Sequence, residues 1–229
     1  MEKARVEDYI RSIPDFPQKG VIFRDITSVL EDADGLHLAI NEMQSRLEGI
    51  EFDKIAGLES RGFIFGMPIA YNMHKPFELI RKAGKLPCET VSESYDLEYG
   101  QATIEIHKNA IQPGDRVVLV DDLIATGGTI AAAAKLVERL GGKVVKMVFL
   151  LELLGLNGRE KLQGYNVESV VSYEGKEFRA IRSARGIVSR HMLGLLHNLA
   201  LKTGGYGQHK DEKRKKDDSG YSVYPDRPG

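Results

Sequence analysis

The chain has 229 residues, 42% hydrophobic and 28% charged, which is typical of a globular protein with room for one α/β domain and further segments. Its formal net charge of -1 argues against a dedicated nucleic-acid binder. The single cysteine, Cys88, excludes an internal disulfide framework and favours a reducing compartment, so we expect a cytoplasmic protein. The charged first residues are unlike a signal peptide. The most apolar run, residues 147–156, is too short to span a bilayer, so no membrane partner is expected.

Short β-branched runs alternate with helical segments over about residues 6–174. Four apolar runs predict strands: residues 55–58, 117–120, 144–151 and 167–173. An alanine-rich helix is expected over residues 129–140, closed by Gly141 and Gly142. Strand, helix and strand at this spacing form the βαβ unit of a parallel sheet, so the fold class is predicted to be α/β.

The sequence changes character after residue 174, so residues 1–174 are predicted to form the folded domain. Residues 175–201 combine four arginines with spaced apolar side chains and favour a basic amphipathic helical extension. Residues 202–229 are rich in glycine, proline and charge clusters, which predicts a disordered tail. The basic run at residues 213–216 is flanked by acids, which favours a solvated segment over a nucleic-acid patch.

The strongest chemical signal is the string VVLVDDLIATGGT at residues 117–129. Ligands of an open parallel sheet bind at the carboxyl ends of its strands, where Asp121 and Asp122 are expected to lie. Carboxylates there can accept hydrogen bonds from the hydroxyls of a sugar or hold Mg²⁺. The helix start that follows offers backbone N–H groups, flexible glycines and hydroxyls to a phosphate, from Ala125, Thr126, Gly127, Gly128 and Thr129.

No Gly-Lys-Ser/Thr follows these glycines, and the carboxylates precede them, so neither a Walker loop nor the dinucleotide fingerprint is present. A plain βα turn with a threonine cap is the alternative. The whole string resembles the diphosphoribosyl-binding motif of type I phosphoribosyltransferases. That resemblance implies their parallel-sheet fold with a small hood and a flexible lid loop, and it makes Asp121 and Asp122 the catalytic pair that orients the ribose.

Residues 16–27 resemble the hood of adenine phosphoribosyltransferases. The resemblance implies that Phe23 stacks on adenine, while the backbones of Ile22 and Arg24 contact its polar edge. An aromatic face beside fixed backbone donors and acceptors suits a neutral purine. Residues 151–162 resemble the segment in which Leu153 packs on the opposite face of the base. Taken alone, Phe23 and Leu153 would be interpreted as core residues.

Two further segments resemble the diphosphate site of the same family. In AGLESRGFIFG, residues 56–66, a strained peptide at Glu59-Ser60 would turn backbone N–H groups of the loop at Ser60 toward the diphosphate. Arg61 would supply a bidentate cation as a catalytic residue. The second segment places three cations in one short turn, which alone would be a solvated basic loop and by resemblance binds the anion: Arg81, Lys82 and Lys85.

Residues 89–100, which contain YDLEYG, resemble the flexible catalytic loop of the adenine enzymes. A polar loop of this length is a candidate lid. The resemblance implies that Glu98 is catalytic and assists proton transfer near the base nitrogens, and that Tyr99 is a lid contact. Without the resemblance, the segment would be interpreted as an exposed hairpin.

The resemblance covers about residues 6–174 and implies a purine-salvage glycosyltransferase that makes AMP and diphosphate from adenine and 5-phosphoribosyl 1-diphosphate. It also implies a homodimer, and magnesium held mainly by the substrate, with a water-mediated contact to Asp121 or Asp122 left open. Two alternatives stay open: a phosphoribosyltransferase for another purine, and a regulator that senses 5-phosphoribosyl 1-diphosphate without catalysis. The intact diphosphate loop and lid argue against the regulator.

Overall fold

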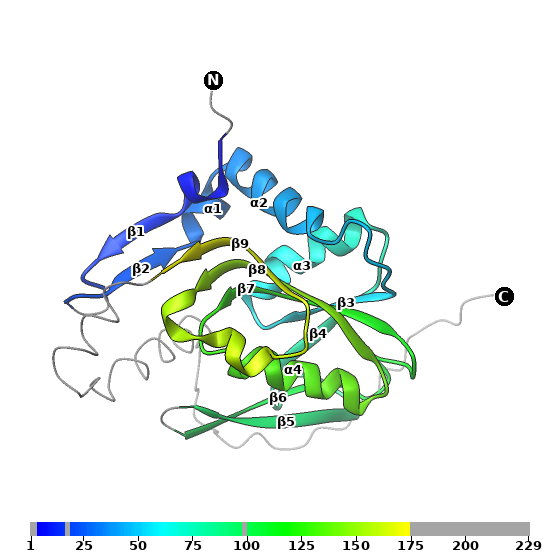
Figure 1. Cartoon of the computed structure of the whole chain (residues 1–229). Coiled ribbons are helices and arrows are strands. Elements are labelled where there is room, and N and C mark those ends of the chain that lie inside the picture. Colours follow the sequence, from blue (N-terminus) through cyan, green and yellow to red (C-terminus); the bar gives the residue numbers. More distant parts are fainter. Residues whose placement is uncertain (1–3, 17–18, 98–99, 175–229) are drawn as a thin grey trace, which may run out of the picture.

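A computed structural model describes residues 4–16, 19–97 and 100–174 (Figure 1). The predictions for Glu98, Tyr99 and residues 175–201 and 202–229 lie outside the described residues. Within the described part, a seven-stranded main sheet is accompanied by a two-stranded sheet near the start of the chain.

The main sheet has the strand order β5-β6-β4-β3-β7-β8-β9. Its strands are β3 (Lys54–Leu58), β4 (Phe77–Lys82), β5 (Thr90–Leu97), β6 (Gly100–His107), β7 (Arg116–Ile124), β8 (Lys143–Leu153) and β9 (Val167–Tyr173). Neighbours from β4 to β9 are parallel, whereas β6 pairs antiparallel with both β4 and β5. The predicted parallel α/β sheet is therefore confirmed.

Helices cover both faces of the main sheet (Figure 1). They are α1 (Thr27–Glu31), α2 (Ala33–Ser45), α3 (Arg61–Asn72) and α4 (Gly128–Arg139), with 3₁₀ turns η1 (Val6–Tyr9), η2 (Leu154–Leu156) and η3 (Gly158–Leu162). In β7, Val118 and Val120 belong to the core that includes α2 and α3, while Val117 and Leu119 belong to the core that includes α4. Because successive side chains of a strand point to opposite faces, a strand between two helical layers must be apolar at nearly every position. No helix in the described ranges has both the length and the apolar content needed to cross a membrane.

The two-stranded sheet, here called the hood sheet, consists of β1 (Arg11–Pro14) and β2 (Ile22–Asp25). The two strands pair antiparallel, with Phe23 opposite Ile13 and Arg24 opposite Ser12. The hood sheet forms a sheet of its own beside the end of β9 (Figure 1).

Two differences between the predicted and the observed elements bear on the site. Strand β7 continues past Val120 to Ile124, because β8 is also longer than predicted and pairs with β7 as far as Glu152. Asp121 and Asp122 therefore lie within the strand and not after it. The interpretation of residues 89–100 as a polar loop is wrong for Thr90–Leu97, which form β5. The reason is the alternation of Val91 and Tyr95, which both pack against the main core.

Candidate active site

The predicted site residues gather where the carboxyl ends of neighbouring parallel strands meet at one edge of the main sheet. In sheet order, β4 carries Arg81 and Lys82, β3 leads to Ser60 and Arg61, β7 carries Asp121 and Asp122, and β8 ends at Leu153. Parallel strands are joined by crossovers that return to the opposite edge, so segments far apart in the sequence meet here.

Asp121 and Asp122 lie against the start of α3. Arg61 Nε is 2.6 Å from Asp122 Oδ2, and the Asp122 side chain is only 7% exposed. A Cβ on Gly62 would lie 2.8 Å from the Val120 carbonyl oxygen and 2.9 Å from Asp121 Oδ1, so glycine is needed for this approach. Burial, and after it the neighbouring Asp122 carboxylate, raises the pKa of Asp121 well above its ordinary value. The two carboxylates repel each other when both are charged, so hydroxyl donors or a cation bound between them would stabilise the charged pair.

The phosphate loop (residues 125–129) joins β7 to α4. Gly127, with φ of +73°, is the N-cap of α4 and has no side chain to bond the first turn. A Cβ on Gly127 would lie 2.3 Å from the Gly158 carbonyl oxygen, and a Cβ on Gly158 would lie 2.4 Å from the Ala125 carbonyl oxygen. The loop and the start of η3 thus touch backbone to backbone. The N–H groups at the start of a helix lack intrahelical partners, so the loop presents donors to an anion.

Two side chains that the sequence analysis did not assign flank the phosphate loop. Thr129 Oγ1 donates a hydrogen bond of 3.1 Å to the Tyr95 hydroxyl. The Tyr95 ring and Lys161 Nζ lie 3.4 Å and 3.8 Å from the position that a Cβ on Gly128 would occupy. The alternation along β5 was an available signal for Tyr95, whereas no local pattern places Lys161 beside α4.

The Glu59-Ser60 peptide bond is cis. Arg81 Nη2 donates to Glu59 Oε1 at 3.1 Å, and the Lys82 backbone N–H donates to Glu59 Oε2 at 3.0 Å. Burial alone would raise the pKa of Glu59, but these hydrogen bonds lower it. Arg81 is therefore engaged with Glu59, whereas Lys82 and Lys85 form no ion pair with a carboxylate in the part of the chain that the structure describes.

A buried carboxylate, Glu105 on β6, holds the turn that follows β4. Its side chain accepts the backbone N–H groups of Lys85 and Leu86, each at 2.9 Å, and the Thr90 hydroxyl at 3.3 Å. Burial opposes the charged form, but these hydrogen bonds lower the pKa of Glu105. Sequence reasoning missed Glu105 because a single acid in a strand gives no sign that it is buried.

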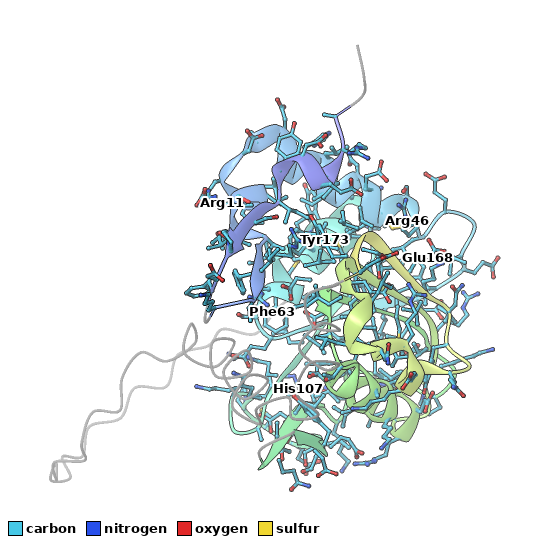
Figure 2. All side chains as sticks on the ribbon, turned by 60° about the vertical axis from the view of Figure 1, so that its left-hand side comes forward. Arg11, Arg46, Phe63, His107, Glu168 and Tyr173 are labelled. Atoms are coloured by element: carbon cyan, nitrogen blue, oxygen red, sulfur yellow. The ribbon has the colours of Figure 1, made fainter. Side chains whose placement is uncertain are left out.

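The predicted base-binding residues lie at the junction of the hood sheet and the main sheet. Phe23 packs edge-on against Phe16, with ring centroids 5.4 Å apart. The Arg24 guanidinium lies 4.0 Å from the centroid of the Tyr173 ring. Tyr173 is the last residue of β9 and is labelled in Figure 2. Ile22, Phe23 and Arg24 are all partly exposed, as residues that meet a ligand must be.

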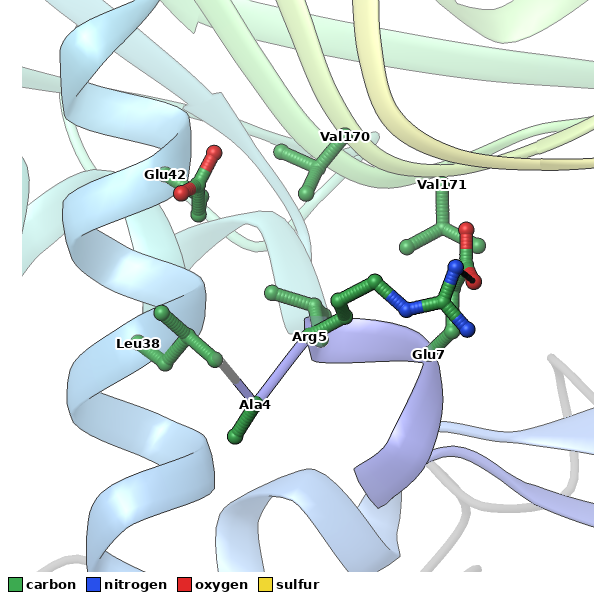
Figure 3. A pocket seen from close by; sticks show the side chains of 8 residues that line it. Ala4, Arg5, Glu7, Leu38, Glu42, Val170 and Val171 are labelled. Carbon is green, nitrogen blue, oxygen red and sulfur yellow. Dashed lines mark ion pairs between the residues drawn. The ribbon is translucent and has the colours of Figure 1, made fainter. Parts of the chain in front are cut away.

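A pocket of about 230 Å³ lies elsewhere, between η1, α2 and β9 (Figure 3). It is lined by Ala4, Arg5, Val6, Glu7, Leu38, Glu42, Val170 and Val171. Arg5 and Glu7 form an ion pair of 3.2 Å there. None of the predicted site residues lines this pocket, so it is not part of the candidate site.

The fold and this edge of the sheet define a type I phosphoribosyltransferase: a parallel sheet with an acidic pair on β7, a glycine loop opening α4 and a small hood. In agreement, the sequence profile described as "Phosphoribosyl transferase domain" matches residues 28–178.

Similar proteins show to which group of phosphoribosyltransferases the chain belongs. The adenine phosphoribosyltransferase of Agathobacter rectalis is 71% identical over 171 residues, which cover 75% of this chain and 98% of that protein. The crystal structure of adenine phosphoribosyltransferase from Thermoanaerobacter pseudethanolicus matches with 54% identity and a TM-score of 0.70, over 73% of this chain and 98% of that chain. The enzyme from Saccharomyces cerevisiae, solved with adenine and an imino-altritol bisphosphate, matches with 38% identity and a TM-score of 0.69, over 72% and 96% of the two chains. The chain belongs to the adenine phosphoribosyltransferases.

Proposed function

We propose that this chain transfers the 5-phosphoribosyl group of 5-phosphoribosyl 1-diphosphate to adenine, giving AMP and diphosphate in purine salvage. The observation that carries the proposal is the arrangement at the end of β7. There, the Asp121-Asp122 pair contacts the start of α3, and the chain continues into the start of α4, where Gly127 provides no capping side chain. Residues 1–174 are the proposed catalytic domain. The cytoplasm is the proposed location, since it would keep the exposed thiol of Cys88 reduced.

The ribose 5-phosphate is proposed to bind across β7 and α4. Asp121 and Asp122 would accept hydrogen bonds from the two ribose hydroxyls, and the phosphate loop would donate its N–H groups to the 5-phosphate. Thr126 and Thr129 can add hydroxyl donors. As the bond from ribose C1 to the diphosphate oxygen breaks, positive charge develops on the ribose, and a carboxylate pair beside it stabilises that charge.

The leaving diphosphate is proposed to lie near Arg61, the loop at Ser60, and the side chains of Lys82 and Lys85. Mg²⁺ suits this position because it is commonly bound by one or two carboxylates together with substrate phosphates, and Asp121 and Asp122 provide two. Among the described residues, no group of three or more His, Cys, Asp or Glu side chains could hold a metal ion. The ion would neutralise charge on the diphosphate.

The adenine ring is proposed to lie between Phe23 and Leu153, with the backbones of Ile22 and Arg24 at its polar edge. Glu98 is proposed to assist removal of the proton that adenine loses when its nitrogen bonds to ribose C1, and Tyr99 to cover the site. Both roles come from the family resemblance. Positioning of the two substrates supplies much of the acceleration, since the protein forms no covalent bond to either.

The test is AMP formation from radiolabelled adenine with 5-phosphoribosyl 1-diphosphate and magnesium, beside a hypoxanthine reaction. Nucleotide from adenine alone supports the proposal. Nucleotide from hypoxanthine instead would assign another purine. Binding of 5-phosphoribosyl 1-diphosphate without turnover of either base would replace the enzyme with a sensing regulator.

We further propose that the chain forms a homodimer through one face of α3. Ile64, Met67 and Tyr71 recur at helical spacing and are 40%, 52% and 84% exposed, which is costly for side chains of this size. Light scattering of the wild type and of a Met67→Glu variant tests this. We expect a dimer for the wild type and a monomer for the variant. A wild-type monomer, or an unaffected dimer in the variant, would contradict the assignment.

A further inference from the structure

The hood sheet has to be held in place by side chains. Its two strands hydrogen-bond to each other and form a sheet separate from the main one. Contacts such as the Arg11 backbone N–H to the Ser28 hydroxyl, at 2.9 Å, tie β1 to α1 and not to the strand ends of the site. The spacing between the hood sheet and those strand ends therefore depends on side chains that bridge the two.

Arg24 and Tyr173 form such a bridge. The Arg24 guanidinium lies 4.0 Å from the Tyr173 ring centroid, a cation–π distance. The same guanidinium donates to the hydroxyl of Ser12, its cross-strand partner on β1. Arg24 thus contacts Ser12 on the hood side and Tyr173 on the main-sheet side.

Tyr173 is also the register partner of Leu153. Strands β8 and β9 are parallel, and their last pair is Leu153 with Tyr173. Paired residues of neighbouring strands present their side chains on the same face of the sheet. Both side chains are partly buried against the same core. The bridge therefore ends beside Leu153, one proposed wall of the base slot, and begins next to Phe23, the other wall.

We propose that Tyr173 and the Arg24 side chain are positioning residues for the base: their stack sets the distance between Phe23 and Leu153 and holds the backbone of β2 at the edge of the ring. This inference rests on the proposed function. It assigns a role in the affinity for a flat purine to Tyr173, which lies on β9, two strands away from the acidic pair on β7. The expected signature is a change in the KM for adenine without an equal change in the KM for 5-phosphoribosyl 1-diphosphate.

The experiment compares Tyr173→Leu with Tyr173→Phe in the full chain. Tyr173→Leu removes the aromatic face, and we expect the KM for adenine to rise roughly threefold to thirtyfold, the range of a cation–π contact. Tyr173→Phe keeps the face and is expected to retain the wild-type KM for adenine. Tyr165→Leu is the matched control, because Tyr165 is another partly buried tyrosine, bonded to Glu138 away from the hood sheet.

Thermal unfolding separates loss of fold from loss of positioning. If Tyr173→Leu does not fold, the Arg24→Met variant tests the inference instead. It removes the cation from a partly exposed position, and it is expected to raise the KM for adenine in the same range. An adenine KM in the deciding variant equal to that of the wild type, or KM values for both substrates that rise together, would overturn the inference. A wild type that turns over no adenine would instead overturn the proposed function.

Discussion

Replacing Gly127 by alanine tests whether the backbone contact between the phosphate loop and η3 shapes the site. Gly127 has φ of +73°, and its Cβ would lie 2.3 Å from the Gly158 carbonyl oxygen. Gly49 has nearly the same φ, +74°, but its Cβ would meet nothing within 4 Å. Both substitutions carry the left-handed backbone cost of about 1–2 kcal/mol. Only Gly127→Ala adds a clash with backbone, for which overpacking costs of about 1–3 kcal/mol are typical.

The two variants are compared by thermal unfolding and by steady-state kinetics. We expect Gly127→Ala to unfold at a lower temperature than Gly49→Ala, and its kcat/KM for 5-phosphoribosyl 1-diphosphate to fall by at least about tenfold. A displacement of the phosphate donors by about 1 Å can cost a factor of about 100. Gly49→Ala is expected to keep wild-type kinetics.

Gly158→Ala approaches the same contact from the other side, since its Cβ would lie 2.4 Å from the Ala125 carbonyl oxygen. It should reproduce the kinetic defect of Gly127→Ala. If Gly127→Ala matched Gly49→Ala in both stability and kcat/KM, the reasoning from close backbone contact would be wrong.

Further predictions concern the acidic pair. The double variant Asp121→Asn with Asp122→Asn is expected to lose AMP formation while remaining folded by circular dichroism; unchanged steady-state rates would refute the assigned role. In the ligand-free protein, the raised pKa of Asp121 means that the folded state binds more protons than the unfolded state as pH rises above about 3.8, so this group lowers stability with rising pH. Asp121→Asn should therefore unfold at a higher temperature than the wild type at pH 7, with a smaller gap at pH 4. Equal gaps at both pH values would show that Asp121 titrates normally.

Much of the main sheet is predictable from local pattern. Strand β9 occupies the predicted residues 167–173, and α4 starts one residue before its predicted first residue. Both succeed because a buried strand needs an apolar run, and because the position after the C-cap of α4, Gly141, has a φ of +89° that favours glycine. For residues 89–100 the residues alone indicated an exposed hairpin, and β5 does pair with β6 in this way, whereas the expectation of a polar loop was wrong for Thr90–Leu97.

A site formed by residues that are close together in the chain could also be predicted. Asp121, Asp122 and the glycines after them lie within a short stretch, where spacing along the chain nearly equals spacing in space. The sequence could therefore indicate a sugar-phosphate site, and the resemblance could extend it to a base and a diphosphate.

Contacts between distant segments were decided by the tertiary structure alone. The pairing of Arg61 with Asp122, of Glu59 with Arg81 and of Gly127 with Gly158 depends on which strands are neighbours and on how far each extends. Burial also depends on how the elements pack. Glu105 is buried where it accepts the backbone N–H groups of the turn after β4, and burial raises the pKa of Asp121. Local composition encodes the elements and their chemistry, whereas partners are set by the sheet order, which a single sequence does not display.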